Sequence, residues 1–144
     1  VAWPNAPVDD PAQVMIAEPR MLHTHDTEAT WWRLVDVPRA LAQRGYDQEA
    51  RLVIEVHGDD LAPWNNGRWL LQTSGDTSQE SQVSATDLNP DITLSIRSLS
   101  GLFSGMYTAQ MLANWSMVSG LPSGISAANR VFATRYAPHC PDHY

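Results

Sequence analysis

The chain has 144 residues, 43% of them apolar, and includes six tryptophans. This length and composition are typical of one globular domain and exclude a disordered chain. The formal net charge of −7 disfavours nucleic acid and anionic membranes as partners, because both bind positive surfaces, and it favours a cationic ligand.

The cysteine content bears on the compartment. Cys140 is the single cysteine, which excludes an intrachain disulfide and indicates a reducing, cytoplasmic setting. No apolar run reaches the ~18 residues that a membrane span needs, and no signal peptide is visible. The first residue is Val1 rather than methionine, and we expect the chain to be part of a longer protein.

The first nineteen residues contain four prolines and predict an extended connecting strap with one helical turn. We expect the globular domain to span residues 20–144. Two strands are predicted, at residues 21–25 and 30–35. The second is rich in aromatic and β-branched side chains, which are common in strands. The turn between them would place Asp26 and Glu28 at a hairpin tip, beside His25.

A helix is predicted after Asp36, which is a suitable N-cap and is followed by Pro38 in the first turn. Gly45 is a suitable C-terminal stop. The most apolar strand candidate is residues 52–56, and its near-continuous apolar character indicates that both of its faces are covered. Further short strands are predicted at residues 68–73, 81–85 and 91–96.

After Arg97 the apolar period becomes helical, and three helices are predicted at residues 98–104, 107–115 and 125–135. Strands first and helices late indicate an α+β fold with a mostly antiparallel sheet and helices packed on one face. The apolar side chains of residues 99–117 suit a packed core or a lipid cavity. We expect Trp32, Trp69 and Trp115 in the core. Trp31 and Trp64 are candidates for a ligand or partner surface, and burial against a second layer is the alternative.

Motifs for other chemistries are weak. His23 and His25 alternate along one predicted strand and could hold zinc only with a third ligand that the sequence does not identify, so no metal is predicted. No nucleophile elbow and no glycine-rich phosphate loop is present. The chain ends with two prolines around Cys140 and a terminal aromatic, Tyr144. Such an end is easily ordered and could place the α-carboxylate at a fixed point.

Residues 32–46 read WRLVDVPRALAQRGY. This run resembles the signature of the C-terminal domain of the enhanced intracellular survival proteins, which are acetyltransferases of the GNAT superfamily. The Trp64-Asn65-x-Gly67-x-Trp69 stretch and the Ala-Pro-x-Cys-Pro ending with a terminal aromatic agree with the resemblance. It begins weakly near residue 10 and covers the rest of the chain.

The resemblance implies a sterol-carrier-protein-like fold, preceded in the whole protein by two GNAT-like domains that this chain lacks. The family transfers acetyl from acetyl-CoA to amines, including aminoglycosides, and forms hexamers. Its general base is the terminal α-carboxylate, which falls here on Tyr144. His25, Asp26, Glu28, Asp142 and His143 would lie at the acceptor rim. Acetyl-CoA would bind outside this chain, so we expect the isolated chain to be inactive.

Three functions follow from these observations. The first is a C-terminal module that supplies the base, part of the acceptor pocket and part of the oligomer interface of an amine acetyltransferase. The second is an apolar-ligand carrier, because sterol-carrier folds elsewhere hold lipids. The third is a purely structural assembly domain. His143 stands where some relatives have an acid, which leaves the acceptor amine open.

Overall fold

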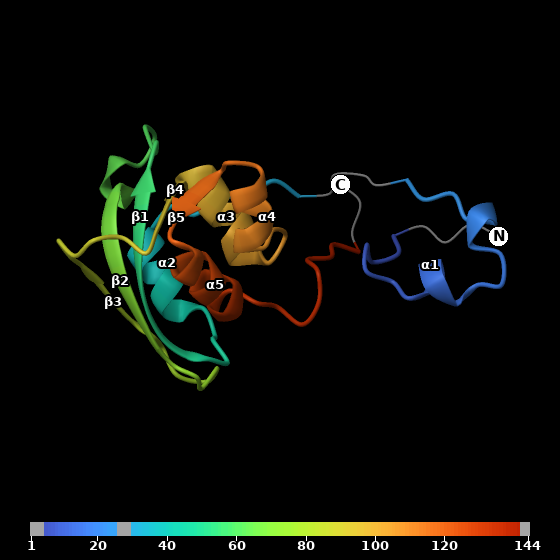
Figure 1. Cartoon of the computed structure of the whole chain (residues 1–144), viewed down its shortest axis with the longest axis horizontal. Coiled ribbons are helices and arrows are strands. Elements are labelled where there is room, and N and C mark those ends of the chain that lie inside the picture. Colours follow the sequence, from blue (N-terminus) through green and yellow to red (C-terminus); the bar gives the residue numbers. More distant parts are fainter. Residues whose placement is uncertain (1–4, 26–29, 142–144) are drawn as a thin grey trace. The chain divides into compact units, whose positions relative to one another are not determined.

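The computed structural model describes residues 5–25 and 30–141. They fall into two compact units. The larger unit, Arg33–Ala133, contains the sheet and most of the helices (Figure 1). The smaller unit combines the chain up to Trp32 with the part that follows Ala133, and it contains α1 (Ala12–Met15) and the 3-10 turn η1 (Pro19–Met21).

Five strands of the larger unit form one sheet in the order β3-β2-β1-β4-β5. Their bounds are β1 (Glu49–His57), β2 (Gly67–Ser74), β3 (Gln82–Ala85), β4 (Ile92–Ser95) and β5 (Val118–Gly120). The central strand β1 pairs antiparallel with β2 and parallel with β4. The outer pairs β2–β3 and β4–β5 are antiparallel. The sheet is therefore mixed, with antiparallel pairing dominant.

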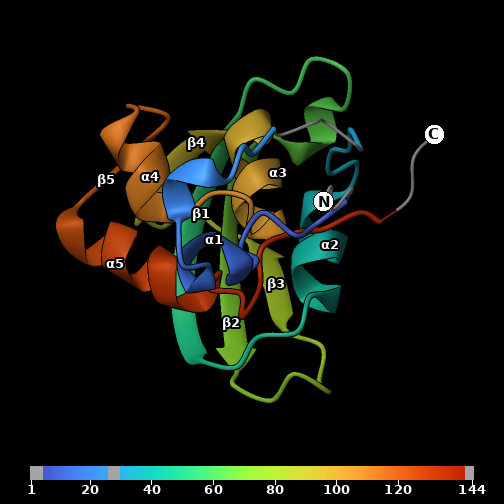
Figure 2. The same cartoon turned by 90° about the vertical axis from the view of Figure 1, so that its right-hand side faces the viewer.

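Four helices lie on one side of this sheet, as Figures 1 and 2 show. They are α2 (Val37–Gln43), α3 (Ile96–Ser104), α4 (Ala109–Asn114) and α5 (Pro122–Val131), and the 3-10 turn η2 (Pro63–Asn65) precedes β2. The predicted α+β class with helices on one face is confirmed.

The core forms between the inner face of the sheet and the helices. β1 contributes Leu52, Ile54 and Val56, all 2% exposed or less. The helices contribute fully buried aliphatic side chains at one-turn spacing: Val37 and Leu41 of α2, Leu99 and Leu102 of α3, Ala109 and Leu112 of α4, and Ala128 and Val131 of α5. This burial of apolar area holds the layers together.

The residues of the WRLVDVPRALAQRGY run fix α2 and its packing. The Asp36 carboxylate accepts a hydrogen bond from the backbone N–H of Arg39 at 3.0 Å, which confirms the predicted N-cap. After the helix, the buried Tyr46 hydroxyl donates to the carbonyl of Leu41 at 3.0 Å, and its ring meets Phe132 edge-on. The signature thus ties α2 to α5.

The outer face of the sheet is polar. Glu55 of β1 accepts hydrogen bonds from Arg68 at 2.9 Å and from the Thr93 hydroxyl at 3.1 Å. These two hydrogen bonds hold the pKa of the Glu55 carboxyl below its usual range, and the bond from Arg68 has the larger effect. Val53, on the same face, is nevertheless buried. The predicted coverage of both faces of this strand is correct at Val53 and only partial at Glu55.

Several predicted elements differ from the structure. The predicted strands at residues 21–25 and 30–35 are wrong, because the described residues there form η1 and irregular backbone. The helix α5 begins at Pro122, three residues before the predicted start, since proline suits the first turn of a helix. The short strand β5 was not predicted. The boundary between strap and domain at residue 19 stays a prediction.

Candidate functional site

The site residues predicted at the sequence level lie mostly outside the described residues. Asp26, Glu28, Asp142, His143 and Tyr144 all fall there. His25 is described and is exposed to solvent. The acceptor rim and the terminal carboxylate therefore stay predictions.

The described part of the tail is held against the beginning of the chain, within the smaller unit. The backbone N–H of Ala137 donates to the Asp9 carboxylate at 2.9 Å. The Asn5 side-chain amide donates to the carbonyl of Pro141 at 3.0 Å. Pro141 is the last residue described, so hydrogen bonds to the strap reach the residue that precedes the final three.

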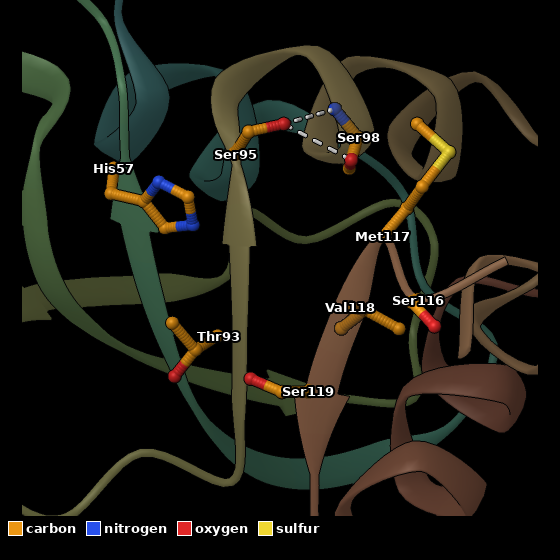
Figure 3. A pocket seen from close by; sticks show the side chains of 8 residues that line it. All are labelled: His57, Thr93, Ser95, Ser98, Ser116, Met117, Val118 and Ser119. Carbon is orange, nitrogen blue, oxygen red and sulfur yellow. Dashed lines mark hydrogen bonds between the residues drawn. The ribbon is translucent and has the colours of Figure 1, made fainter.

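A pocket of about 290 Å³ opens where β4 and β5 meet the start of α3 (Figure 3). Hydroxyl side chains dominate its lining, which consists of His57, Thr93, Ser95, Ser98, Ser116, Met117, Val118 and Ser119. Ser95 is the N-cap of α3, and its hydroxyl oxygen accepts from the N–H of Ser98 at 3.2 Å. Ser95 and Ser98 also share a hydrogen bond between their hydroxyls at 3.1 Å.

This pocket can form hydrogen bonds with a small polar molecule, but it is not built for nucleophilic catalysis. Within the described part of the chain, no hydrogen bond joins the His57 imidazole to a serine hydroxyl of the pocket. An activated serine requires a base within hydrogen-bond reach. The Thr93 hydroxyl is already engaged by Glu55.

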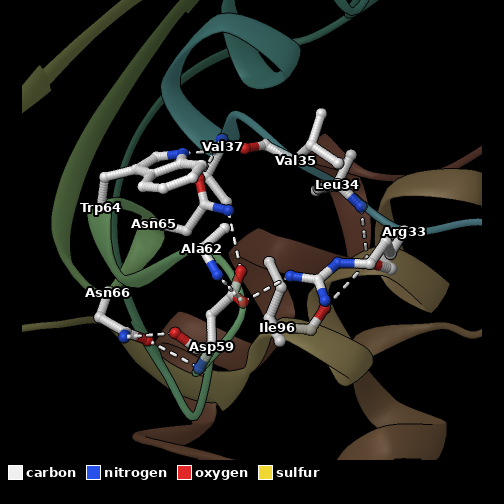
Figure 4. Close-up of polar contacts among 11 residues, drawn as sticks. Arg33, Leu34, Val35, Val37, Asp59, Ala62, Trp64, Asn65, Asn66 and Ile96 are labelled. Atoms are coloured by element: carbon white, nitrogen blue, oxygen red, sulfur yellow. Dashed lines mark hydrogen bonds and ion pairs between the residues drawn. The ribbon is translucent and has the colours of Figure 1, made fainter.

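A buried carboxylate, Asp59, is the second cluster that could carry chemistry (Figure 4). Its oxygens accept from the Asn65 side-chain amide at 2.9 Å, from the N–H of Ala62 at 2.9 Å and from the Arg33 guanidinium. Asn65 in turn accepts from the N–H of Val37 at 2.8 Å. The cluster therefore links the start of α2 to the turn before β2.

The electrostatics of Asp59 fit a structural role. The hydrogen bond from Asn65 is the largest cause that holds the pKa of the Asp59 carboxyl below its usual range; the Arg33 and Ala62 bonds act in the same direction, and burial opposes them. A general base must come within hydrogen-bond reach of the substrate proton that it accepts. The Asp59 carboxylate is buried and both of its oxygens already accept hydrogen bonds, so it organises the turn.

The tryptophans divide differently from the prediction. Trp69 is packed against the core, as predicted, and its indole N–H donates to the carbonyl of Asn65 at 3.0 Å. Trp32 and Trp115 were predicted in the core but are 46% and 50% exposed. Trp31 and Trp64 are exposed, which favours the surface alternative over burial against a second layer, and the Trp64 indole N–H donates to the carbonyl of Val35 at 3.0 Å (Figure 4).

The stretch at residues 99–117 is neither all core nor an apolar cavity. Leu99, Leu102 and Leu112 are fully buried. Large apolar side chains on the other side of the same stretch are exposed: Met106, Tyr107, Met111 and Trp115. The helical period alone does not identify this exposed surface, but the charge pattern of the sequence coincides with it. Residues 98–129 contain no Asp, Glu, Lys, Arg or His.

Neither a metal site nor a membrane span is found in the described part of the chain. Among residues 5–25 and 30–141, no three His, Cys, Asp or Glu side chains gather closely enough to hold a metal ion. His23 and His25 are both exposed. The helices described are all too short or too polar to cross a bilayer.

The fold and its signature place the chain in a known class. The sterol carrier protein domain family matches residues 37–141, and the chain belongs to this family. The match covers all five strands of the sheet, together with α2 to α5. It confirms the sterol-carrier-like fold implied by the resemblance.

Within that class, the similar proteins are acetyltransferases by name. An uncharacterized N-acetyltransferase of Streptomyces coelicolor is 35% identical over 136 residues, which make up 94% of this chain and 32% of that protein. A second, from Streptomyces griseus, is 32% identical over 93% of this chain and 32% of its own length. The chain thus spans about a third of the relatives that it matches.

The solved structures agree. Eis1 from Mycobacterium abscessus superposes with a TM-score of 0.78 and 34% identity, over 96% of this chain and 34% of that one. A GCN5-related N-acetyltransferase from Anabaena variabilis gives a TM-score of 0.66 and 28% identity, over 73% of this chain and 26% of that one. The chain is therefore a sterol-carrier-like domain related to acetyltransferases of the Eis and GNAT type.

Proposed function

We propose that this chain is the C-terminal domain of an acetyl-CoA-dependent amine N-acetyltransferase, of the kind that accepts aminoglycosides. One observation carries the proposal: more than 90% of the chain matches proteins named N-acetyltransferases, and it spans only about a third of each. The remaining polypeptide would contain two GNAT-like domains, and the whole protein would assemble as a hexamer.

The role of this domain would be to supply the general base. The α-carboxylate of Tyr144 has an ordinary pKa of about 3.3–3.7, so it is ionised at neutral pH. An ionised carboxylate attracts a cationic amine and can accept its proton, directly or through water, once the amine is positioned. His25, Asp26, Glu28, Asp142 and His143 would form part of the acceptor pocket.

The contacts of the tail support this role. The hydrogen bonds from Ala137 to Asp9 and from Asn5 to Pro141 hold the tail just before its last three residues. A terminal carboxylate can serve as a base only when its position is restricted, because proton transfer requires an approach of about 2.6–3.2 Å. The two prolines around Cys140 restrict the backbone further.

Acetyl-CoA would bind to the polypeptide outside this chain. The sequence contains no glycine-rich loop to receive a pyrophosphate. The isolated chain would therefore show no acetyl transfer, and the activity would need the longer protein.

The experiment compares acetyl transfer by the longer protein with and without Tyr144, on a polyamine and a panel of aminoglycosides. Deleting Tyr144 moves the carboxylate by one residue, so kcat should fall by about 100-fold or more, which is the usual contribution of a general base. Binding of acetyl-CoA, measured by calorimetry, should not change. The control, Tyr144→Phe, keeps the α-carboxylate and the ring and should retain kcat.

Two results would overturn parts of the proposal. An unchanged kcat after deletion would place the base elsewhere. Activity on no aminoglycoside, with activity on other amines, would remove the aminoglycoside assignment and leave the amine acetyltransferase. A lipid-carrying role is the second candidate, and a fluorescent fatty acid that bound the chain saturably would favour it.

A further inference from the structure

Residues 98–129, which include α4, β5 and most of α3 and α5, contain no Asp, Glu, Lys, Arg or His. Charged residues make up 17% of the chain as a whole. Solvent-facing surfaces of soluble domains are normally rich in charged side chains, whereas the centres of protein interfaces are depleted of them. A run of this length without charge therefore indicates that part of this surface is covered.

Four large side chains form an exposed apolar area within this uncharged region. We call it the Trp115 surface; it consists of Met106, Tyr107, Met111 and Trp115, which are 53%, 37%, 39% and 50% exposed. The rings of Tyr107 and Trp115 meet edge-on, with centroids 5.3 Å apart. Met111 lies one helical turn before Trp115 and so shares its face of α4. Tyr107, Met111 and Trp115 are therefore neighbours, and Met106 directly precedes Tyr107 in the chain.

The backbone beneath the Trp115 surface is fixed. The N–H of Tyr107 donates to the carbonyl of Gly101 at 3.2 Å, and its ring lies so close to Gly101 that an added Cβ would come within 2.6 Å of it. The Thr108 hydroxyl caps α4 by accepting from the N–H of Met111 at 3.1 Å. A surface whose side chains are already held in place loses little entropy when it is covered.

We propose that the Trp115 surface is the docking face through which this domain packs against the remaining polypeptide of the longer protein. Tryptophan, tyrosine and methionine are the residue types enriched at interface centres. The relatives supply the occupant, because about two thirds of their length lies outside the matched region. A covalently connected occupant also benefits from a high effective concentration and needs few polar contacts.

The charge of the chain argues against a membrane as the occupant. An anionic bilayer attracts clusters of Lys and Arg, and the Trp115 surface lies in a stretch that has none, within a chain of net charge −7. A second copy of the chain is the remaining competitor, and the experiment separates it by its dependence on concentration. The inference rests on the proposed function in one respect: it requires that the chain be part of a longer polypeptide.

Hydroxyl-radical footprinting with mass spectrometry tests the proposal, because methionine, tryptophan and tyrosine are readily oxidised by it. The oxidation rates of Met106, Met111 and Trp115 are measured in the 144-residue chain and in the longer protein. We expect rates at least fivefold lower in the longer protein, unchanged when the protein is diluted tenfold. Leu121, exposed within the same uncharged stretch but outside the Trp115 surface, is the reference side chain.

Two results would overturn the proposal. Equal oxidation rates in both proteins would show that the rest of the polypeptide does not cover the surface. Protection that is lost when the oligomer is dissociated to monomers, checked by light scattering, or that is already present in the 144-residue chain, would assign it to a second copy or to the chain itself. The readout does not depend on acetyl transfer, so a failure of the proposed activity and a failure of this docking face are distinguishable.

A variant provides a second measurement. Met111→Gln keeps the size of an exposed side chain and makes it polar, so it should leave the thermal unfolding of the 144-residue chain unchanged. In the longer protein it should raise the oxidation rate of Trp115 at least twofold, because the docked face is weakened. Leu121→Gln is the matched control and should leave the Trp115 rate unchanged. A Trp115 rate that responds equally to both variants would contradict the proposal.

Discussion

The side chain of Arg44 offers the sharpest test of how the domain is held together. It leaves the end of α2 and reaches the C-terminal ends of two other helices. Its guanidinium donates to the carbonyl of Phe103 at 3.1 Å and to that of Phe132 at 3.0 Å, with longer bonds of 3.4 Å to Val131 and Gly45. A cation at these helix ends also interacts favourably with their dipoles.

The loss expected from Arg44→Met can be estimated from these contacts. Each of the two shorter hydrogen bonds to a charged donor contributes about 1.5 kcal/mol. The guanidinium also lies 4.9–5.8 Å from the ring centres of Tyr46, Phe103 and Phe132, which adds about 1 kcal/mol. Burial lowers the pKa of Arg44, and this cost of desolvation offsets about 1 kcal/mol. The net loss is about 3 kcal/mol.

Urea denaturation followed by circular dichroism measures this loss, and a melting curve should show a fall of about 9 °C. Arg44→Lys keeps the charge without the planar fork and should recover less than half of the stability. Arg39→Met changes an exposed arginine of the same helix and should cost less than about 0.5 kcal/mol. If the free energy of unfolding of Arg44→Met lies within about 1 kcal/mol of that of the unmodified chain, this side chain does not hold α2, α3 and α5 together.

Three further predictions concern stability. Gly124→Ala should destabilise the chain by about 1–3 kcal/mol in urea, because its Cβ would lie 2.2 Å from the backbone carbonyl oxygen of Asp91, and a neutral result would mean that α5 can shift. Leu112→Ala should cost about 2–5 kcal/mol, since this side chain is fully buried, and a cost below about 1 kcal/mol would contradict that burial. The pKa of the Asp59 carboxyl is lower in the folded chain than in the unfolded chain. The ionised carboxylate should therefore contribute its full stabilisation of the fold above the unfolded-state pKa of about 3.9, and this contribution should decrease as the pH falls through the folded-state pKa. In Asp59→Asn this part of the acid-induced loss of stability should be absent, and an unchanged pH dependence would refute it.

Local chemistry allowed much of the larger unit to be predicted. The N-cap at Asp36 and the strand around residues 52–56 follow from short-range preferences that tertiary packing reinforces: a side-chain acceptor beside free N–H groups, and a dense apolar run. The sterol-carrier-like fold itself was predicted from the resemblance of residues 32–46, and the family match confirms it.

The errors occur where an element depends on a partner. Residues 30–35 have strand-forming composition, but strand preference mainly reflects packing against neighbouring strands, and the described residues there form irregular backbone. The short strand β5 consists of Val118, Ser119 and Gly120 and is defined by its pairing with β4 rather than by its composition. Neither outcome could be predicted from local sequence.

The apolar side chains of α4 show a different difficulty. A helical period identifies which residues share a face but not which apolar face is covered within the chain. Leu112 is fully buried, whereas Met111 and Trp115, which was expected in the core, are exposed. The absence of charge from residues 98–129 is the sequence feature that coincides with these exposed apolar side chains. Most of the predicted acceptor site lies outside the described residues, so it rests on the resemblance.

The position of the terminal carboxylate is the central claim, and adding one glycine after Tyr144 in the longer protein tests it most directly. The addition keeps every side chain of the protein and moves only the carboxylate. We expect kcat for acetyl transfer to the preferred amine to fall by about 100-fold or more, while acetyl-CoA binds as before. Unchanged turnover in the extended protein would contradict the assignment of the base to the C-terminus of this domain.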